Sequence, residues 1–322
     1  MPPKKLLAEI RKKSNKTFLV CAHVNLEGDA LGSELAVYWL LKALGKKVIL
    51  LNEDNVPREY AFLPGAKFIR HGAEALDYDV AILVDCSDPF RIGKIQKFLR
   101  KDRVIINIDH HISNSCFGDI NWIEAGSSSA CEMIFYLFKA LGVKIKKREA
   151  ICLYSGIMTD TGSFKYKTTS WRTHYITSEL LKTGLDVYQI YRYINESLKV
   201  GTVEALGKII RTLSVSGDGR VAWLVVRNSL IRHEPDLAEA TDSIIYFARS
   251  IAGVEVAMLF KEIKANKEVR VNFRSTGKAD VNRIAKVFGG GGHRMASGAT
   301  IRGNFKGSVD KVVMEARKEV AG

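Results

Sequence analysis

Short apolar runs alternate with amphipathic segments along the first half of the chain. Runs rich in Val, Ile and Leu predict strands at residues 17–22, 47–51, 79–84 and 104–108. Helices are predicted at residues 31–44, 91–99 and 128–141, the first ending at Gly45 and the last preceded by serines that can cap it. This alternation is typical of an α/β fold with a parallel sheet covered on both faces.

The pattern changes after residue 160. Helical segments are predicted at residues 170–182, 187–195 and 202–213, and two hairpins follow, joining residues 214–216 to 221–226 and residues 254–263 to 268–274. A helix at residues 280–288 then leads into a glycine run. We therefore predict an N-terminal domain (residues 1–185), a helical connector (186–213) and a smaller mixed α+β C-terminal domain (214–322).

Composition places the chain among cytoplasmic globular proteins. It has 322 residues, of which 47% are hydrophobic and 26% charged. No apolar run approaches the roughly 20 residues that span a bilayer, and the first residues lack the apolar stretch of a signal peptide. The five cysteines show no C-x-x-C spacing and lie mostly in apolar contexts, so we expect reduced core thiols.

The formal net charge of +14 favours an anionic partner. A basic surface attracts polyanions such as nucleic acids and speeds their association. Many Lys-rich proteins are equally basic without binding nucleic acid, so charge alone leaves both interpretations open.

Acidic and histidine side chains follow the predicted strands. His23, Glu27 and Asp29 come after the first strand, Asp85 after the third, and Asp109-His110-His111 after the fourth, while Asp160 follows an apolar helix. Carboxyl ends of parallel strands share one edge of a sheet, where ligands bind. Carboxylates and imidazoles are the ligands that a pair of divalent cations requires.

Each of these residues also has a simpler interpretation. A lone histidine is more often a surface or core residue than a ligand, and an aspartate after a strand often caps a helix. Here Asp88, beside Pro89, is the better cap for the helix near Arg91, which leaves Asp85 for another role. An acid at a helix C-terminus, as at Asp160, is disfavoured by the helix dipole, and a bound cation compensates for it.

The Asp109-His110-His111 triplet predicts divided roles. Consecutive residues on an extended strand point to opposite faces, so we expect one histidine to bind metal and the other to reach substrate or orient the site.

The glycine run near the C-terminus is a second candidate site. Gly289-Gly290-Gly291-Gly292-His293 exposes backbone N–H groups that can approach a phosphate, with Arg274 supplying further charge. The alternatives are a flexible turn for the glycines and a solvated strand-edge charge for Arg274. The run matches neither a P-loop nor a dinucleotide-binding fingerprint.

Taken in order, these segments resemble the DHH phosphoesterase superfamily, from about residue 15 to 320. The matching pieces are His23-x-Asn25-x-Glu27-Gly28-Asp29-Ala30-x-Gly32-Ser33, Val84-Asp85-x-Ser87-Asp88-x-x-Arg91-x-Gly93, Asp109-His110-His111, Gly156-x-x-Thr159-Asp160-Thr161-Gly162-x-Phe164, Arg274-Ser275 and the Gly-rich segment with His293. Within the superfamily the chain is most similar to the small oligoribonucleases that also act on 3′-phosphoadenosine-5′-phosphate. The Gly-rich ending speaks against the family's pyrophosphatases.

The resemblance implies two divalent cations, with Mn²⁺ expected and Mg²⁺ or Co²⁺ as alternatives. His23, Glu27 and Asp85 would hold the first ion, and Asp29, Asp85, His110 and Asp160 the second. Asp109 would orient a histidine, and His111 would face the scissile phosphate. Arg274, Ser275, Gly290, Gly291, Gly292 and His293 would hold the rest of the substrate, with the active site in the cleft between the domains.

Glu27 departs from the pattern of the family. That position is usually Asp, often preceded by Pro where this chain has Leu26. Glutamate keeps the charge but adds a methylene, so we expect the site to bind metal with an altered affinity for the first ion.

The expected activity is hydrolysis of very short RNA to mononucleotides, with removal of the 3′-phosphate of 3′-phosphoadenosine-5′-phosphate as a second activity. Alternatives are a cyclic or linear dinucleotide phosphodiesterase, a single-strand-specific DNA exonuclease, and, in a different class, a nucleotide-binding regulator with a weakened metal site. The expected partner is a short single-stranded RNA or nucleotide and no membrane. A homodimer is left open.

Overall fold

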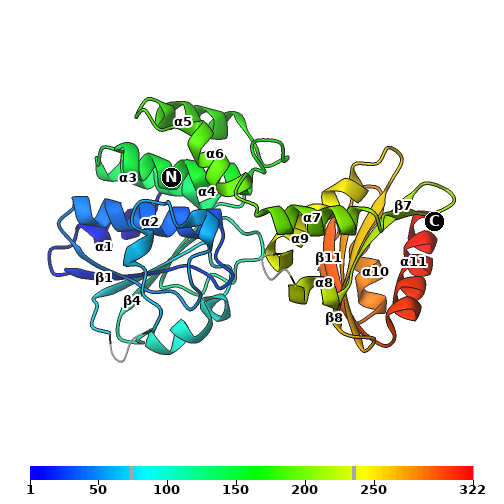
Figure 1. Cartoon of the computed structure of the whole chain (residues 1–322). Helices are drawn as coiled ribbons and strands as arrows, with labels where there is room; N and C mark the ends of the chain where they lie inside the picture. Colours follow the sequence, from blue (N-terminus) through cyan, green and yellow to red (C-terminus); the bar gives the residue numbers. More distant parts are fainter. Residues whose placement is uncertain (73–75, 234–236, 322) are drawn as a thin grey trace. The chain divides into compact units, whose positions relative to one another are not determined.

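The computed structural model describes residues 1–72, 76–233 and 237–321, without the side chains of residues 238–243. Packing divides the chain into two compact units, Met1–Ser197 and Leu198–Gly322 (Figure 1). The predicted limits at residues 185 and 213 stay a prediction. The predicted connector contributes α6 (Val187–Asn195) to the first unit and α7 (Val200–Ile210) to the second.

The first unit is built around a five-stranded parallel sheet with strand order β2-β1-β3-β4-β5. The strands are β1 (Thr17–Cys21), β2 (Lys47–Leu50), β3 (Val80–Val84), β4 (Val104–Asp109) and β5 (Ile120–Ile123). The four predicted strands and their parallel arrangement are confirmed. β5 was not predicted, because the polar Asn121 interrupts its short apolar run. The chain leaves β1 and β3 in opposite directions along the sheet, so a topological switch point lies between them.

Helices cover one face of this sheet, and a 3-10 segment packs on the other (Figure 1). Besides α6, the helical segments are α1 (Lys4–Arg11), α2 (Gly28–Ala43), α3 (Ala130–Leu141), α4 (Lys147–Asp160), α5 (Trp171–Leu181), η1 (Arg58–Tyr60), η2 (Ala66–Phe68) and η3 (Pro89–Phe98). Side chains of β1 alternate between the faces, with Phe18 and Val20 in the core under the helices and Leu19 and Cys21 in the opposite core. The prediction of a sheet covered on both faces is confirmed.

The predicted helix at residues 91–99 is wrong in type. The segment is the 3-10 helix η3, broken at Gly93, which has φ 60° and ψ −140°. Glycine tolerates this backbone conformation, and a Cβ at this position would collide with the side chain of Glu53. The predicted cap is confirmed, because the Asp88 carboxylate accepts a hydrogen bond from the first turn of η3.

Two glycines allow α2 and α4 to lie in close contact. A Cβ at Gly28 would collide with the Thr159 side chain, and a Cβ at Gly156 would meet Asp29. This close packing brings Asp29, in the first turn of α2, next to Asp160, the last residue of α4.

The second unit contains a six-stranded mixed sheet with order β10-β11-β9-β8-β7-β6. Its elements are β6 (Ser214–Val215), β7 (Val221–Val226), β8 (Val256–Lys264), β9 (Glu268–Ser275), β10 (Gly291–His293), β11 (Ala296–Arg302), α8 (Asn228–His233), α9 (Leu237–Arg249), α10 (Val281–Val287) and α11 (Phe305–Ala321). Both predicted hairpins, β6–β7 and β8–β9, are antiparallel pairs. The prediction of a smaller mixed α+β unit is confirmed.

Four of the five cysteines are buried, as predicted, whereas Cys116 is exposed, and all five are free thiols. Among the described residues, no helix is long and apolar enough to cross a membrane.

Glu34 is a fully buried acid on α2. Its Oε2 accepts a hydrogen bond of 2.6 Å from Asn52 Nδ2, and the Oδ1 of Asn52 accepts one from Ala22 N at the end of β1. Burial raises the pKa of Glu34 to about 8, and the bond from Asn52 offsets only part of that shift. The carboxyl group therefore folds into the core in its protonated form.

A raised folded-state pKa makes the contribution of Glu34 to stability depend on pH. That contribution is fully present below pH 4.5 and is lost as pH rises through about 8, at up to ~1.4 kcal/mol per pH unit. The variant Glu34→Gln keeps the acceptor for Asn52 and cannot ionise, so its free energy of unfolding should fall less over this interval. Urea unfolding of both proteins between about pH 5 and pH 8 measures the difference. The exposed Glu196→Gln in the same unit should follow the wild type, and parallel pH profiles for wild type and Glu34→Gln would contradict the prediction.

Candidate metal centre

The predicted ligands converge at the carboxyl end of the parallel sheet. His23 follows β1, Asp85 follows β3 and His110 follows β4, so the cluster lies at the switch point between β1 and β3 and beside it. Asp29 from α2 and Asp160 from α4 complete it. Candidate ligand atoms form three groups, each with its atoms within 4.8 Å of one another: His23, Glu27 and Asp85; Asp29, His110 and Asp160; and Asp85, Asp109, His110 and His111.

In the first group, the ring of His23 is held by the backbone carbonyl of Val24. Its Nδ1 lies 2.7 Å from Val24 O, and because a carbonyl only accepts, this nitrogen carries the proton. The lone pair of Nε2 is thereby directed into the cluster, 3.3 Å from Asp85 Oδ2 and 4.0 Å from Glu27 Oε1. A fixed tautomer with a free Nε2 is the usual state of a metal-binding histidine.

Glu27 also caps α2. Its Oε1, the atom nearest His23, lies 3.4 Å from Ala30 N, from which it accepts the capping hydrogen bond. One carboxylate is therefore shared between the helix end and the candidate ligand group.

The second group surrounds the Nε2 atom of His110. It lies 3.8 Å from Asp29 Oδ2, 3.4 Å from Asp85 Oδ1 and 3.4 Å from Asp160 Oδ2. The carboxylate of Asp29 is fixed by the start of α3, where it accepts hydrogen bonds from Ala130 N (2.6 Å) and Cys131 N (2.9 Å). The helix dipole of α3 therefore positions this acid.

Asp85 contributes to both ligand groups. Its Oδ2 faces His23 and its Oδ1 faces His110, and Oδ1 is a buried acceptor without a hydrogen-bond partner among the described residues. A buried unsatisfied carboxylate oxygen is costly, and a cation at this point removes the cost. The backbone of Asp85 has φ +56°, an uncommon conformation for a residue with a side chain, while its N–H donates to Ile108 O.

Burial and the charges of neighbouring carboxylates raise the pKa values of three acids in the cluster. Burial, followed by repulsion from Asp85, raises the pKa of Asp29 to about 6. Partial burial and then repulsion from Asp85 raise the pKa of Glu27 to about 7, and partial burial and the charge of Asp29 raise that of Asp160 to about 9. Divalent cations would replace these protons, so the residues present fit a metal centre.

Two groups titrate in the opposite sense. Burial alone would raise the pKa of Asp85, but the imidazoles of His110 and His23 outweigh it and hold that pKa well below its ordinary value. Burial alone would lower the pKa of His110, but the surrounding carboxylates, Asp85 first, raise it to about 10. Without metal, a proton on His110 takes the place of the missing positive charge.

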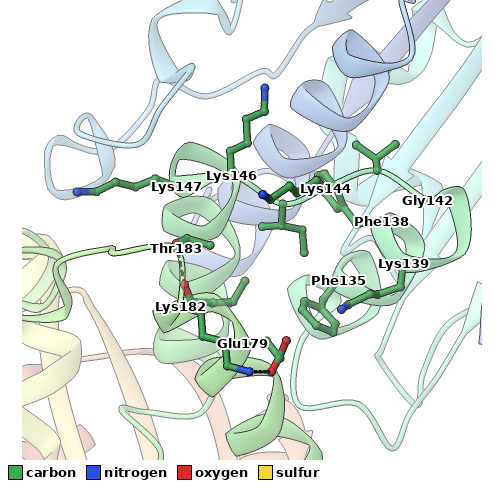
Figure 2. Close-up of a pocket in the computed structure, with 13 residues that line it drawn as sticks. Phe135, Phe138, Lys139, Gly142, Lys144, Lys146, Lys147, Glu179, Lys182 and Thr183 are labelled. Atoms are coloured by element: carbon green, nitrogen blue, oxygen red, sulfur yellow. Dashed lines mark hydrogen bonds and ion pairs between the residues drawn. The ribbon is translucent and has the colours of Figure 1, made fainter.

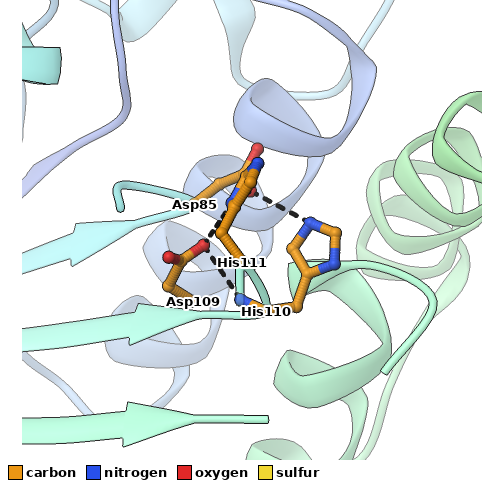
Figure 3. Close-up of side chains that lie close together, drawn as sticks. All are labelled: Asp85, Asp109, His110 and His111. Carbon is orange, nitrogen blue, oxygen red and sulfur yellow. Dashed lines mark hydrogen bonds and ion pairs between the residues drawn. The ribbon is translucent and has the colours of Figure 1, made fainter. Parts of the chain in front are cut away.

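His111 is held by Asp109. Its Nδ1 donates a hydrogen bond of 2.7 Å to Asp109 Oδ1 (Figure 3). Asp109 is fully buried and also accepts from Asn114 Nδ2 at 2.6 Å, a partner that sequence reasoning missed because no short motif marks it. The side chain of His111 is 40% exposed, against 5% for His23 and 14% for His110, so it is the histidine open to a substrate.

The predicted alternation of His110 and His111 across a strand is wrong. β4 ends at Asp109, so both histidines lie beyond the strand. Their ring centroids are 4.7 Å apart at an interplanar angle of 55°, and both rings lie near Asp85 (Figure 3). The two histidines differ in the exposure of their side chains and in the hydrogen bond that His111 Nδ1 donates to Asp109.

The predicted substrate residues lie in the second unit, in β9 and at β10. Arg274 is partly exposed, and its Nη1 donates to Phe273 O. The Ser275 hydroxyl is buried, donating to Ala279 O and accepting from Gly277 N, so it stabilises its own turn.

The glycine run has divided structural roles. A Cβ at Gly290 would collide with Gly298 O of β11, and one at Gly292 would meet Ala296 O at 2.6 Å, so close packing requires both glycines. Gly291 faces open space, and His293 is exposed. The predicted cleft between the two domains stays a prediction.

Comparisons with known proteins agree with this geometry. Residues 17–157 match the DHH family, N-terminal domain, and residues 222–322 match the DHHA1 domain. The chain is 28% identical over 319 residues to the bifunctional oligoribonuclease and PAP phosphatase NrnA of Thermus thermophilus, covering 98% of this chain and 93% of that protein. It is 26% identical over 288 residues to the protein of the same name from Bacillus subtilis, covering 88% and 89%.

A solved structure is also similar over nearly the whole chain. The crystal structure of an exopolyphosphatase-related protein from Bacteroides fragilis matches with a TM-score of 0.89 at 26% identity, covering 98% of this chain and 95% of that one. Together these matches confirm the predicted superfamily resemblance and the fold class.

Replacing Asp85 should abolish binding at both ion positions, because among the described residues it is the carboxylate that faces both His23 and His110. We expect the Mn²⁺ stoichiometry measured by isothermal titration to fall from two to no more than weak residual binding in Asp85→Asn, which keeps the side-chain volume. Asp77→Asn is the matched control, since Asp77 is 94% exposed, and it should bind two ions. Retention of one tight ion by Asp85→Asn would show that Asp85 does not bridge.

Shortening Glu27 should weaken the first ion selectively. In Glu27→Asp the carboxylate retracts from His23 and Asp85, so we expect a roughly tenfold loss of affinity for one ion, about 1.4 kcal/mol, and no change for the other. Aspartate remains a good helix cap, so the melting temperature of the metal-free protein should not change. Titration with Mn²⁺ and thermal melting measure both effects. Tighter binding of Mn²⁺ by Glu27→Asp, or binding of a single ion by the native chain, would contradict the assignment of Glu27 to the first ion.

Proposed function

Because the chain consists of a DHH family N-terminal domain followed by a DHHA1 domain, we propose that it is a two-metal phosphoesterase acting on very short RNA. It hydrolyses oligonucleotides of a few residues to mononucleotides. As a second activity, it removes the 3′-phosphate from 3′-phosphoadenosine-5′-phosphate.

The position of Asp85 carries this proposal. A carboxylate shared by two ligand groups, with one buried oxygen that accepts no hydrogen bond from the described residues, fits two cations held close together. When bound, such a pair neutralises phosphoryl oxygens and lowers the pKa of a water nucleophile. The relatives named bifunctional oligoribonuclease and PAP phosphatase, which align over most of this chain, support the choice of substrate.

Mn²⁺ is the ion we propose. Mg²⁺ prefers oxygen ligands alone, whereas both ligand groups here include an imidazole, His23 in one and His110 in the other. The remaining ligands are carboxylates, which suit Mn²⁺ as well.

His111 is proposed to contact the scissile phosphate. With the Nδ1 proton donated to Asp109, the ring is held in one orientation and its Nε2 is left for the substrate. When protonated, that nitrogen donates a hydrogen bond to a phosphoryl oxygen, and Asp109 stabilises the resulting imidazolium. His111 is the most exposed of the three histidines in the cluster, which supports this role.

The second unit is proposed to hold the part of the substrate that does not react. Arg274 and His293 supply positive charge, and Gly291 offers a backbone N–H in open surroundings. Contacts at two ends of a substrate favour short strands over long ones.

A substrate panel tests the proposal. With Mn²⁺ we expect turnover of RNA of two to five nucleotides and of 3′-phosphoadenosine-5′-phosphate, and much slower cleavage of long RNA and single-stranded DNA. His111→Ala should lower kcat by roughly 10²- to 10⁴-fold while leaving Mn²⁺ stoichiometry unchanged, because the proposal assigns His111 to the phosphate and not to a cation. The exposed His71→Ala should match the wild type.

Other outcomes identify the alternatives. Preferred cleavage of a cyclic or linear dinucleotide, or of single-stranded DNA, would replace the proposed substrate with that one. Tight nucleotide binding without turnover under any divalent ion would show that the chain is a binding protein and not an enzyme.

A further inference from the structure

A basic cavity lies at the end of α4 opposite to Asp160. It has a volume of about 640 Å³ and lies between the end of α3, the loop into α4, and the end of α5 (Figure 2). This volume is in the usual range for small-molecule sites. α4 has 14 residues, about 20 Å at the rise of an α-helix, so the cavity is well separated from the metal centre. We call it the lysine pocket.

The pocket carries a strong excess of positive charge. Five lysines line it, Lys139, Lys144, Lys146, Lys147 and Lys182, with one acid, Glu179. Glu179 is already paired with Lys182 (Figure 2). In the part of the chain that the structure describes, no carboxylate lies within 4.0 Å of the ammonium groups of the other four lysines. These four charges are therefore open to an anionic ligand.

The start of α4 adds to the positive charge around the pocket. Lys146, the N-cap residue, has no side-chain acceptor to offer the first N–H groups, and Lys147 and Arg148 follow it. Cations at a helix N-terminus oppose the helix dipole, whereas an anion there is stabilising. The only acid of the first turn, Glu149, is buried and occupied by Lys146 N and Arg148 Nε.

The N-terminal end of α4 carries Lys146, Lys147 and Arg148 against the single acid Glu149, so the net charge at each end opposes the helix dipole. Asp160, an acid at the C-terminal end, is explained by the cations of the proposed metal centre. Among the described residues, no counter-charge accounts for the lysines at the N-terminal end. A bound anion would provide that counter-charge.

The inner surface of the pocket is apolar. The half-buried Val143 and Ile145 present this surface, and the buried side chains of Phe135, Phe138 and Leu180 pack behind it. An inorganic anion would leave the exposed parts of Val143 and Ile145 without a contact, whereas a nucleoside would cover them. The combination of an apolar surface with five lysines suits a ligand that has an organic part and several negative charges.

We propose that the lysine pocket binds a nucleotide carrying several phosphate groups, at a site separate from the metal centre. The phosphates contact Lys144, Lys146 and Lys147 at the start of α4, and the nucleoside packs against Val143 and Ile145. This inference does not depend on the reaction proposed for the metal centre.

Binding of ATP to the full-length chain tests the site. Isothermal titration in EDTA avoids metal-mediated binding at the other site, and tripolyphosphate serves as a probe without a nucleoside. We expect Lys144→Ala/Lys147→Ala to weaken ATP binding at least tenfold, as the loss of two charge-assisted contacts predicts. Lys4→Ala/Lys5→Ala is the matched control, because it removes the same charge from exposed lysines in the first turn of another helix, α1.

The remaining measurements separate this site from others. ATP should bind more tightly than tripolyphosphate and should raise the melting temperature of the wild type but not of Lys144→Ala/Lys147→Ala. Both lysine double variants should keep wild-type phosphoesterase activity. An equal loss of affinity in the two double variants would reduce the effect to general charge attraction and overturn the proposal. Unchanged affinity in Lys144→Ala/Lys147→Ala, or no binding by the wild type at millimolar ATP, would also overturn it.

Discussion

The first unit must hold several carboxylates close together against their mutual repulsion, and the rest of its structure depends on this constraint. Asp29, Asp85 and Asp160 are held together with His110, although each added negative charge makes ionisation of the others harder. Only a rigid scaffold keeps such groups in place, and the parallel sheet provides it by ending its central strands at one edge. Divalent cations are the natural complement of this arrangement, since they replace protons and satisfy the free oxygen of Asp85.

The helix α4 connects this constraint to the rest of the unit. Gly28 and Gly156 let α2 and α4 pack closely enough to bring two acids together, one from each helix. The same helix ends in an acid and begins with three cations against the one acid Glu149, so the net charge at each end opposes its dipole. A helix stabilised by tertiary packing tolerates such charges, and that tolerance makes both ends available for ligands of opposite charge.

Much of the fold was predictable because buried parallel strands have a strong signal. β3 is a continuous apolar run, β1 is apolar after Thr17, and β4 has three apolar residues before Asn107. Both hairpins of the second unit have clear turn residues. Other features had weak or conflicting signals. β5 contains Asn121, whose side chain hydrogen-bonds to the backbone of the preceding loop, and the helical pattern near Gly93 gave no sign that the helical backbone breaks there. The alternation expected for His110 and His111 was wrong because β4 ends at Asp109, before both histidines.

The sequence by itself determined the superfamily, the fold class and the chemical type of the site, because these depend on residue types and their order along the chain. The tertiary structure alone decided how the residues divide their work. It showed that Asp109 and Asn114 fix His111, that Asp29 is held by the start of α3, and that two of the glycines near His293 serve packing. It also brought the lysines of three separate segments around one cavity. Such relations depend on contacts between residues far apart in the chain, and no local pattern encodes them.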